Sequence, residues 1–318
     1  LGPDWSFGAK ATYRNLKSII DDFCDEAPFA AYAARNNIDA EALGINAALG
    51  AQCYLFNPGK ANTFAVQYGD GSFHDWTLTK EDFAGNSNGV GFPDLERKYL
   101  ALNLYLEHQF ADDWFGRVEY VWSQNYGDSE GLLKSDLGQQ DPSVTQDWDF
   151  PELMIGSRGY LPNDRRHQLK AYGFWQMSPE WRLGARATVL SGRPKNCIGN
   201  APEGFDRQGY GASFFYCDFT DNVDPVTGDP ISDPVATPRG SQGRLPWTYT
   251  MDLSVDYIPA WANNNLTLTA QVFNVFAQQR PLSIVETHDG PDAQNYGRVI
   301  SYQTPRFLQL TARYDFSL

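Results

Sequence analysis

Polar and apolar residues alternate without interruption along the last eleven residues of the chain, Leu308–Leu318. Gln309, Thr311 and Arg313 belong to the polar set, and leucine, alanine and aromatic residues occupy the positions between. Side chains of a strand point alternately to its two faces, so the segment predicts a strand with one apolar and one polar surface. Its length is about what a tilted strand needs to cross a bilayer. The first hypothesis is therefore an all-β protein, a transmembrane antiparallel β-barrel.

Similar alternation recurs along the rest of the chain. It predicts seven further strands, at residues 5–13, 100–106, 114–122, 168–177, 181–189, 248–257 and 265–272. With the terminal segment this makes about eight crossings. Short turns and long connections join them in strict alternation, and the long connections lie at about 21–96, 127–166, 192–247 and 277–306.

The short turns share one feature, a tryptophan at or beside the start of the following strand. These tryptophans are Trp5, Trp114, Trp181 and Trp261. Tryptophan favours the headgroup layer of a membrane, and bacterial outer-membrane barrels combine short periplasmic turns with long external loops. Because the last strand ends on the short-turn side, we expect a periplasmic carboxyl terminus and extracellular long loops.

A soluble β-sandwich is the alternative, since it also has alternating strands and turns rich in Gly and Pro. It predicts no alternation of short and long connections. Its polar faces belong in water, whereas here the polar face mixes Arg182, Lys170 and Asp252 with aromatic residues such as Tyr172 and Phe174. That mixture is typical of a wet or plugged barrel lumen, and it favours the barrel.

Composition is consistent with this hypothesis and excludes other classes. Aromatic residues make up 14% of the 318 residues, which fits the aromatic girdles of a barrel. The mean hydropathy is −0.47, and no run of eighteen apolar residues predicts a membrane-spanning helix. The net charge of −14 argues against nucleic acid as a partner.

Four cysteines form two local pairs in the sequence, Cys24 with Cys53 and Cys197 with Cys217. Local pairing is one of three possible connectivities, and it predicts disulfides formed in an oxidising compartment. Four unrelated buried thiols are the alternative. The chain begins at Leu1 without a signal peptide, so we expect either processing or a piece of a longer protein.

Several motifs resemble the C-terminal barrel of TonB-dependent receptors, particularly the Oar-like group. They are Gly131–Gln139, the run Gly159–Lys170 with its Asn-Asp-Arg-Arg-His element, Ser191–Pro194 and Val272–Phe276. The resemblance spans nearly the whole chain. It implies a 22-stranded barrel in the outer membrane of a Gram-negative cell, an N-terminal plug domain and a segment that engages TonB.

This chain contains neither a plug nor a TonB segment, and about eight of those strands. An isolated group of strands leaves two open edges in lipid, where unpaired backbone groups are costly. We therefore expect that the remaining barrel strands complete the barrel, or that the eight strands close into a narrow barrel of their own.

The function implied by the resemblance is uptake of a substrate that external loops bind, with energy from the inner membrane. Expected partners are outer-membrane lipid and lipopolysaccharide, the plug domain and TonB. A structural or surface-interaction barrel without transport is the alternative. An enzyme is not expected: Gly85–Gly89 matches Gly-x-Ser-x-Gly without a preceding apolar strand, and the four histidines show no metal-ligand spacing.

Two groups of loop residues are candidates for ligand binding. Aromatic residues of the loops could contact substrate, or pack loop against loop; they are Trp148, Phe150, Tyr210, Phe214, Phe215 and Tyr216. Five carboxylates in a short segment could hold Ca²⁺, or form a solvated acidic loop; they are Asp218, Asp221, Asp224, Asp229 and Asp233. No other cofactor is expected.

Two further expectations concern the first loop and the lumen. Residues 28–51 are rich in Ala with Leu and Ile at helical spacing, which predicts one or two short helices. On the polar face, Arg182 and Arg186 follow Lys170 by one strand and precede Asp252 and Asp256 by another. Such opposite charges predict ion pairs on the lumen wall, or pairs with a plug.

Overall fold

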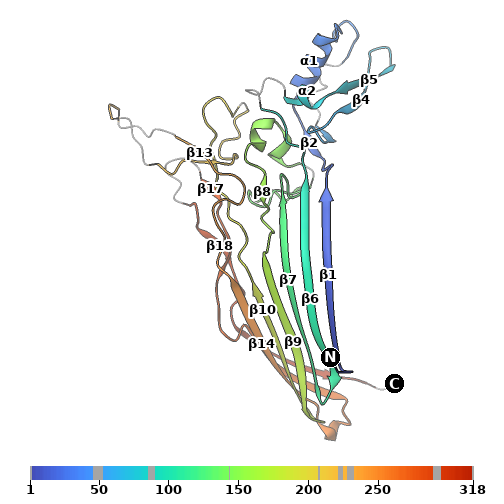
Figure 1. Ribbon diagram of the computed structural model, residues 1–318, viewed down its shortest axis with the longest axis vertical. Helices are drawn as coiled ribbons and strands as arrows, with labels where there is room; N and C mark the ends of the chain where they lie inside the picture. The colour runs from blue at the N-terminus through green and yellow to red at the C-terminus, as the bar shows by residue number, and fades with distance from the viewer. Residues whose placement is uncertain are drawn as a thin grey trace.

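One long antiparallel sheet forms the body of the molecule in the computed structural model (Figure 1). Residues 2–45, 53–84, 90–142, 144–206, 208–220, 225–227, 233–288 and 295–316 are described. Eight strands pair in chain order. They are β1 (Trp5–Leu16), β6 (Arg97–Ala111), β7 (Trp114–Gly127), β9 (His167–Ser178), β10 (Trp181–Leu190), β14 (Thr248–Tyr257), β15 (Leu266–Phe273) and β19 (Phe307–Tyr314).

The strand register keeps the apolar positions of neighbouring strands on one face. Leu183 of β10 lies opposite Trp175 of β9 and Val255 of β14, and Ala270 of β15 lies opposite Leu310 of β19. A shift of one residue would exchange the two faces, so the alternation of the sequence fixes the pairing. This confirms the predicted antiparallel sheet of about eight strands.

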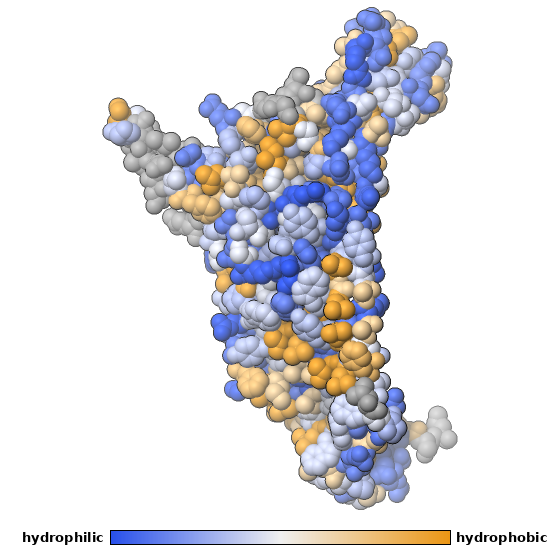
Figure 2. Space-filling model, in the orientation of Figure 1, coloured by the Kyte–Doolittle hydropathy of each residue, from blue (hydrophilic) through white to orange (hydrophobic). Residues whose placement is uncertain are grey.

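The apolar face of this sheet is exposed. Leu310 and Leu308 have 73% and 61% of their surface accessible, and Trp175 has 50%. Figure 2 shows apolar side chains gathered over the strands, between more polar surfaces at both ends of the sheet. A β-sandwich would bury such a face against a second sheet. The exposed face therefore favours a barrel wall over the sandwich.

Within the described residues, β1 and β19 are the two ends of the strand order and do not pair with each other. The narrow eight-stranded barrel that we considered is thus not formed. The terminal strand is also shorter than predicted: it ends at Tyr314, and residues 317–318 lie outside the described part.

Tight turns join the strands at the end where both termini lie (Figure 1). Asp112 and Asp113 between β6 and β7 have φ of 49° and 65°, and Asn263 and Asn264 before β15 have φ of 52° and 60°. Asp and Asn tolerate this left-handed region better than other residues, and two successive positive φ values match the twist of a hairpin. Two of the predicted short turns are therefore built from residues that tolerate such turns.

The long connections gather at the opposite end (Figure 1). The first contains β2 (Asp21–Phe23), α1 (Ala27–Arg35), β3 (Tyr54–Phe56), β4 (Asn62–Gln67), β5 (Phe73–Leu78) and α2 (Lys80–Ala84). The second contains η2 (Gln146–Trp148), η3 (Pro151–Met154) and β8 (Gly159–Tyr160). The third contains β11 (Ile198–Gly199), β12 (Tyr216–Cys217) and β13 (Val235–Ala236), and the fourth β16 (Pro281–Ile284), β17 (Thr287–His288) and β18 (Val299–Tyr302).

One helix confirms part of the prediction for residues 28–51. It is α1, which begins with Pro28 in its first turn, a position where proline costs no hydrogen bond. Residues 46–52 lie outside the described part. η4 (Ala260–Ala262) precedes β15, and no helix among the described residues has the length and apolar character of a membrane span.

Candidate functional site

The long connections pack against each other around two cores, and together they form what we call the loop cap. The larger core is built from aromatic and aliphatic residues of the first connection, with Trp148 and Met154 contributed by the second. The smaller core joins Phe150 and Leu153 of the second connection to Phe214 of the third. The cap is thus a packed layer and not a set of independent loops.

Both predicted disulfides are formed within the cap. Cys24 pairs with Cys53 in the first connection, and Cys197 pairs with Cys217 in the third. Each closes a local loop, with separations of 29 and 20 residues. A crosslink of this span restrains the unfolded loop and so favours the packed arrangement.

Five of the six aromatic residues that were candidates for substrate contact lie at these cores, and the sixth, Phe215, lies beside Arg239 and Lys134. Trp148, Phe150, Phe214 and Phe215 are completely buried. Tyr210 and Tyr216 are half-buried and pack against the smaller core. The four buried rings pack between loops, which is the alternative to substrate contact that the sequence left open. Tyr210 and Tyr216 retain accessible surface.

A buried group of charged side chains, which the sequence did not point to, clamps the second connection to the third. Arg239 Nη1 lies 2.9 Å from Asp136 Oδ2 and Nη2 lies 3.5 Å from Asp147 Oδ2, and Lys134 pairs with Asp147 as well. Both cations lie over the ring of Phe215, at 4.7 Å for Arg239 and 5.1 Å for Lys134. Buried charges need such partners, so the cap tolerates little rearrangement here.

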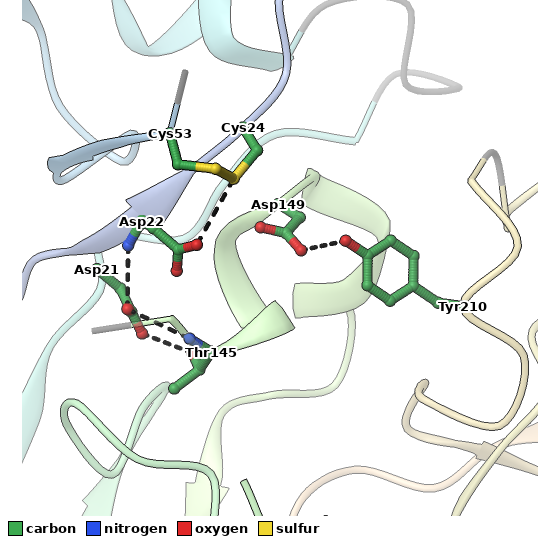
Figure 3. The surroundings of a disulfide bond; sticks show 7 residues. All are labelled: Asp21, Asp22, Cys24, Cys53, Thr145, Asp149 and Tyr210. Carbon is green, nitrogen blue, oxygen red and sulfur yellow. Dashed lines mark hydrogen bonds between the residues drawn. A yellow bond between two sulfur atoms is a disulfide. The ribbon is translucent and has the colours of Figure 1, made fainter. Parts of the chain in front are cut away.

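An acidic junction joins the first connection to the second (Figure 3). Asp21 accepts hydrogen bonds from Thr145 Oγ1 at 2.5 Å and from the backbone N–H groups of Thr145 and Asp22. Asp149 accepts a hydrogen bond from the hydroxyl of Tyr210, which belongs to the third connection. The carboxyls of Asp21, Asp22 and Asp149 are therefore gathered where three connections meet.

The pKa values of the three acids in this junction are raised, because the carboxyls are buried and lie close to one another. Burial raises the pKa of Asp22 to about 7, and repulsion by Asp149 and Asp21 adds to the shift. Burial also raises the pKa of Asp149 to about 6, although the hydrogen bond from Tyr210 opposes it. For Asp21 burial again raises the pKa, against the hydrogen bonds from Thr145. Desolvation disfavours the charged form of each acid.

The structure describes only part of the predicted calcium loop. Asp218 accepts hydrogen bonds from Thr220 Oγ1 and N–H and from the N–H of Asp233, which brings two of the five residues together. Asp221, Asp224 and Asp229 lie outside the described residues, as does the Gly85–Gly89 motif. Asp218 thus receives its hydrogen bonds from its own loop. Because three of the five residues are not described, binding of Ca²⁺ there stays a prediction.

One ion pair that we expected on the polar face of the sheet is present. Arg182 Nη2 lies 2.7 Å from Asp256 Oδ2, joining β10 to β14. Asp252 accepts a hydrogen bond from the N–H of Asn274 at 2.8 Å instead. The polar face therefore satisfies part of its charge within the wall.

A further contact holds the fourth connection to the third connection. Glu286 accepts hydrogen bonds from Arg193 Nη1 at 3.2 Å and from the N–H of Asn196 at 2.9 Å. Burial raises the pKa of Glu286 to about 7, although Arg193 opposes this shift.

An open antiparallel wall with one exposed apolar face and a packed cap at one end is typical of the wall of a β-barrel. No protein-family model matches the chain. It is similar to the TonB-dependent transporter Oar of Myxococcus xanthus, with 27% identity over 282 residues, which cover 74% of this chain. This relative confirms the resemblance to Oar-like TonB-dependent receptors that the motifs indicated. The chain spans 24% of the length of that relative.

Solved outer-membrane transporters and receptors are similar in structure. The transporter YddB of Escherichia coli matches with a TM-score of 0.49 and 10% identity, over 99% of this chain and 31% of that one. The ferripyoverdine receptor of Pseudomonas aeruginosa matches with a TM-score of 0.37 and 14% identity, over 70% of this chain and 20% of that one.

Proposed function

We propose that this chain is part of the barrel wall of a TonB-dependent outer-membrane transporter. The observation that carries the proposal is the sheet of eight sequentially paired strands with an exposed apolar face. Lipid is the surface that such a face fits, because strands in a bilayer must pair all backbone groups and present apolar side chains outward. The transporter relative supports uptake as the activity.

Among the described residues, no strand pairs with the outer edges of β1 and β19. We propose that further barrel strands pair with both, and that a plug domain fills the lumen against the polar face that carries Arg182 and Asp256. TonB then acts through the plug, and the energy comes from the inner membrane. In this proposal the plug moves and the barrel wall stays rigid.

The two kinds of connection support a proposal for the orientation in the membrane. We place the loop cap outside the cell, where it meets substrate and lipopolysaccharide, and the short turns and carboxyl end in the periplasm. Trp5, Trp114 and Trp181 begin strands at the short-turn end, where headgroups would surround them.

Peptides, proteins, glycans and iron chelates are all compatible with the cap, and we propose no catalytic role. A structural barrel that binds other surface molecules without transport is the rival function. No contact in the described residues favours it, whereas the transporter relative favours uptake.

The test is accumulation of labelled peptides, dextrans and ferric chelates in cells that produce the complete protein. We expect one class to accumulate, and accumulation to be lost both without this protein and without the inner-membrane energy transducer. Accumulation that depends on neither, for every class offered, would leave the structural barrel as the better account.

A further inference from the structure

One oxygen of the buried Asp22 carboxyl has no hydrogen-bond partner. Only 9% of the residue surface is accessible, and Oδ1 has no partner. Oδ2 lies 3.5 Å from Cys24 Sγ, the contact drawn in Figure 3. That sulfur is bonded to Cys53 and carries no hydrogen, so it donates nothing to the carboxylate. Buried carboxylates are normally paired or bound to a metal ion.

Asp149, in the second connection, also has a buried oxygen without a hydrogen-bond partner. It is 7% accessible, and its Oδ1 has no partner while Oδ2 accepts the Tyr210 hydroxyl. Figure 3 shows that the Asp149 oxygen without a hydrogen bond is directed toward Asp22, while the other is directed toward Tyr210. The charged groups that act on the two residues are themselves carboxylates, Asp21 and Asp147.

We propose that a divalent cation of the Ca²⁺ type binds between Asp22 and Asp149. Hard cations prefer carboxylate oxygens, and both Ca²⁺ and Mg²⁺ complete their coordination with main-chain carbonyls and water. Each carboxylate has a buried oxygen available for such an ion. A bound cation would offset the repulsion between the two carboxylates.

The surrounding groups select the kind of ion. Asp22, Cys24 and Cys53 have ligand atoms within 4.8 Å of one another, which resembles a thiolate site. Both sulfurs are consumed by the disulfide, so they offer no thiolate to a soft metal such as zinc. Asp21 is occupied by Thr145 and the Asp22 N–H. Oxygen ligands from Asp22 and Asp149 are what remain, and these favour Ca²⁺.

The site would act as a joint of the loop cap. Asp22 belongs to the first connection and Asp149 to the second, and the hydroxyl of Tyr210 extends the joint to the third. A cation there would hold three connections in one arrangement. This assignment is distinct from the acidic loop around Asp218.

Terbium luminescence tests the site directly, because Tb³⁺ replaces Ca²⁺ at oxygen sites and is sensitised by nearby tryptophan. Trp148 is buried and precedes Asp149 in sequence. In detergent-solubilised protein we expect sensitised emission that Ca²⁺ displaces. Trp148→Phe should lower the emission while Ca²⁺ binding measured by calorimetry remains. Absence of Ca²⁺-displaceable emission and of calorimetric Ca²⁺ binding overturns the proposal.

Charge-neutralising variants locate the ion. Asp22→Asn and Asp149→Asn keep side-chain size and relieve repulsion, so they should fold, and each should weaken Tb³⁺ binding by more than about tenfold. Asp70→Asn, in an exposed turn, should leave it unchanged. Emission that falls with Asp218→Asn but survives Asp22→Asn would place the ion elsewhere and overturn the proposal.

Limited proteolysis provides a second measurement. The loop cap of the unaltered protein should resist protease several-fold better with Ca²⁺ than with a chelator. In Asp22→Asn the two conditions should give equal rates. A chelator effect of the same size in both proteins would exclude Asp22 as a ligand.

Discussion

Arg239 Nη1 lies 2.9 Å from Asp136 Oδ2, and neither side chain has any surface accessible to solvent. The two residues are 103 positions apart and come from different long connections. An ion pair in such surroundings is costly to form and more costly to break, because removal of one partner leaves a buried unpaired charge. This contact therefore sets the arrangement of the loop cap.

Replacement of Arg239 by methionine should loosen the cap. We expect a loss of about 3–5 kcal/mol of local stability, since Asp136 and Asp147 lose a buried partner. Hydrogen exchange of the second and third connections measures it. Arg313→Met is the control: its pair with Asp315 is exposed, and its loss should cost under about 1 kcal/mol. Equal effects of the two variants would contradict the clamp.

Gly159 provides a steric test of the same junction. A Cβ at this position would lie 1.9 Å from the carbonyl oxygen of Arg239, and backbone cannot move aside as a side chain can. Gly159→Ala should therefore cost about 1–3 kcal/mol and separate β8 from the third connection. Gly91→Ala meets nothing within 4 Å and should be neutral. Protease sensitivity of the cap distinguishes the two variants.

The strands were predictable because alternation is a local signal. Residues 248–257 were predicted as a strand and form β14 with the same bounds. Where both faces become polar the signal ends before the strand does: the prediction stopped at Trp122, whereas β7 continues through Ser123 to Gly127. Hydrogen bonding to β6 maintains the strand there, and periodicity does not record it.

The loop cap was not predictable in the same way. Its contacts join residues that are far apart in sequence, such as Arg239 with Asp136, and no spacing rule connects them. Aromatic residues in the loops, including Phe214 and Phe215, indicated ligand contact or packing equally, because composition does not distinguish a buried ring from an exposed one. The acidic junction depends on Thr145 and Tyr210, which carry no motif.

Spin labels test which face of the sheet meets lipid. Labels at Leu268, Leu310 and Val255, on the apolar face, should be relaxed by bilayer-dissolved oxygen several-fold more than labels at Thr269 and Thr311. The threonines lie opposite each other on the polar face and serve as matched controls. Similar oxygen accessibility for both sets would contradict the lipid-facing assignment on which the proposed function depends.

The contact of Glu286 with the third connection should depend on pH. Burial raises its pKa from 4.5 to about 7, against the attraction of Arg193 and with added repulsion from Asp136. The folded cap then binds this proton more tightly than the unfolded loops do. Its contribution to stability is therefore complete below about pH 4.5 and is lost as the pH rises toward about 7, where the buried carboxyl ionises.

Hydrogen exchange at the Asn196 N–H, which donates to Glu286 Oε1, reports on this contact. After correction for intrinsic exchange, we expect protection at pH 5 to exceed protection at pH 8. Glu286→Gln stays neutral and retains an acceptor for the N–H, so its protection should change little with pH. Because Tyr296 also lies within the field of Glu286, Tyr296→Phe is a further control that should keep the pH dependence. A pH dependence that persists in Glu286→Gln would assign the titration to another group.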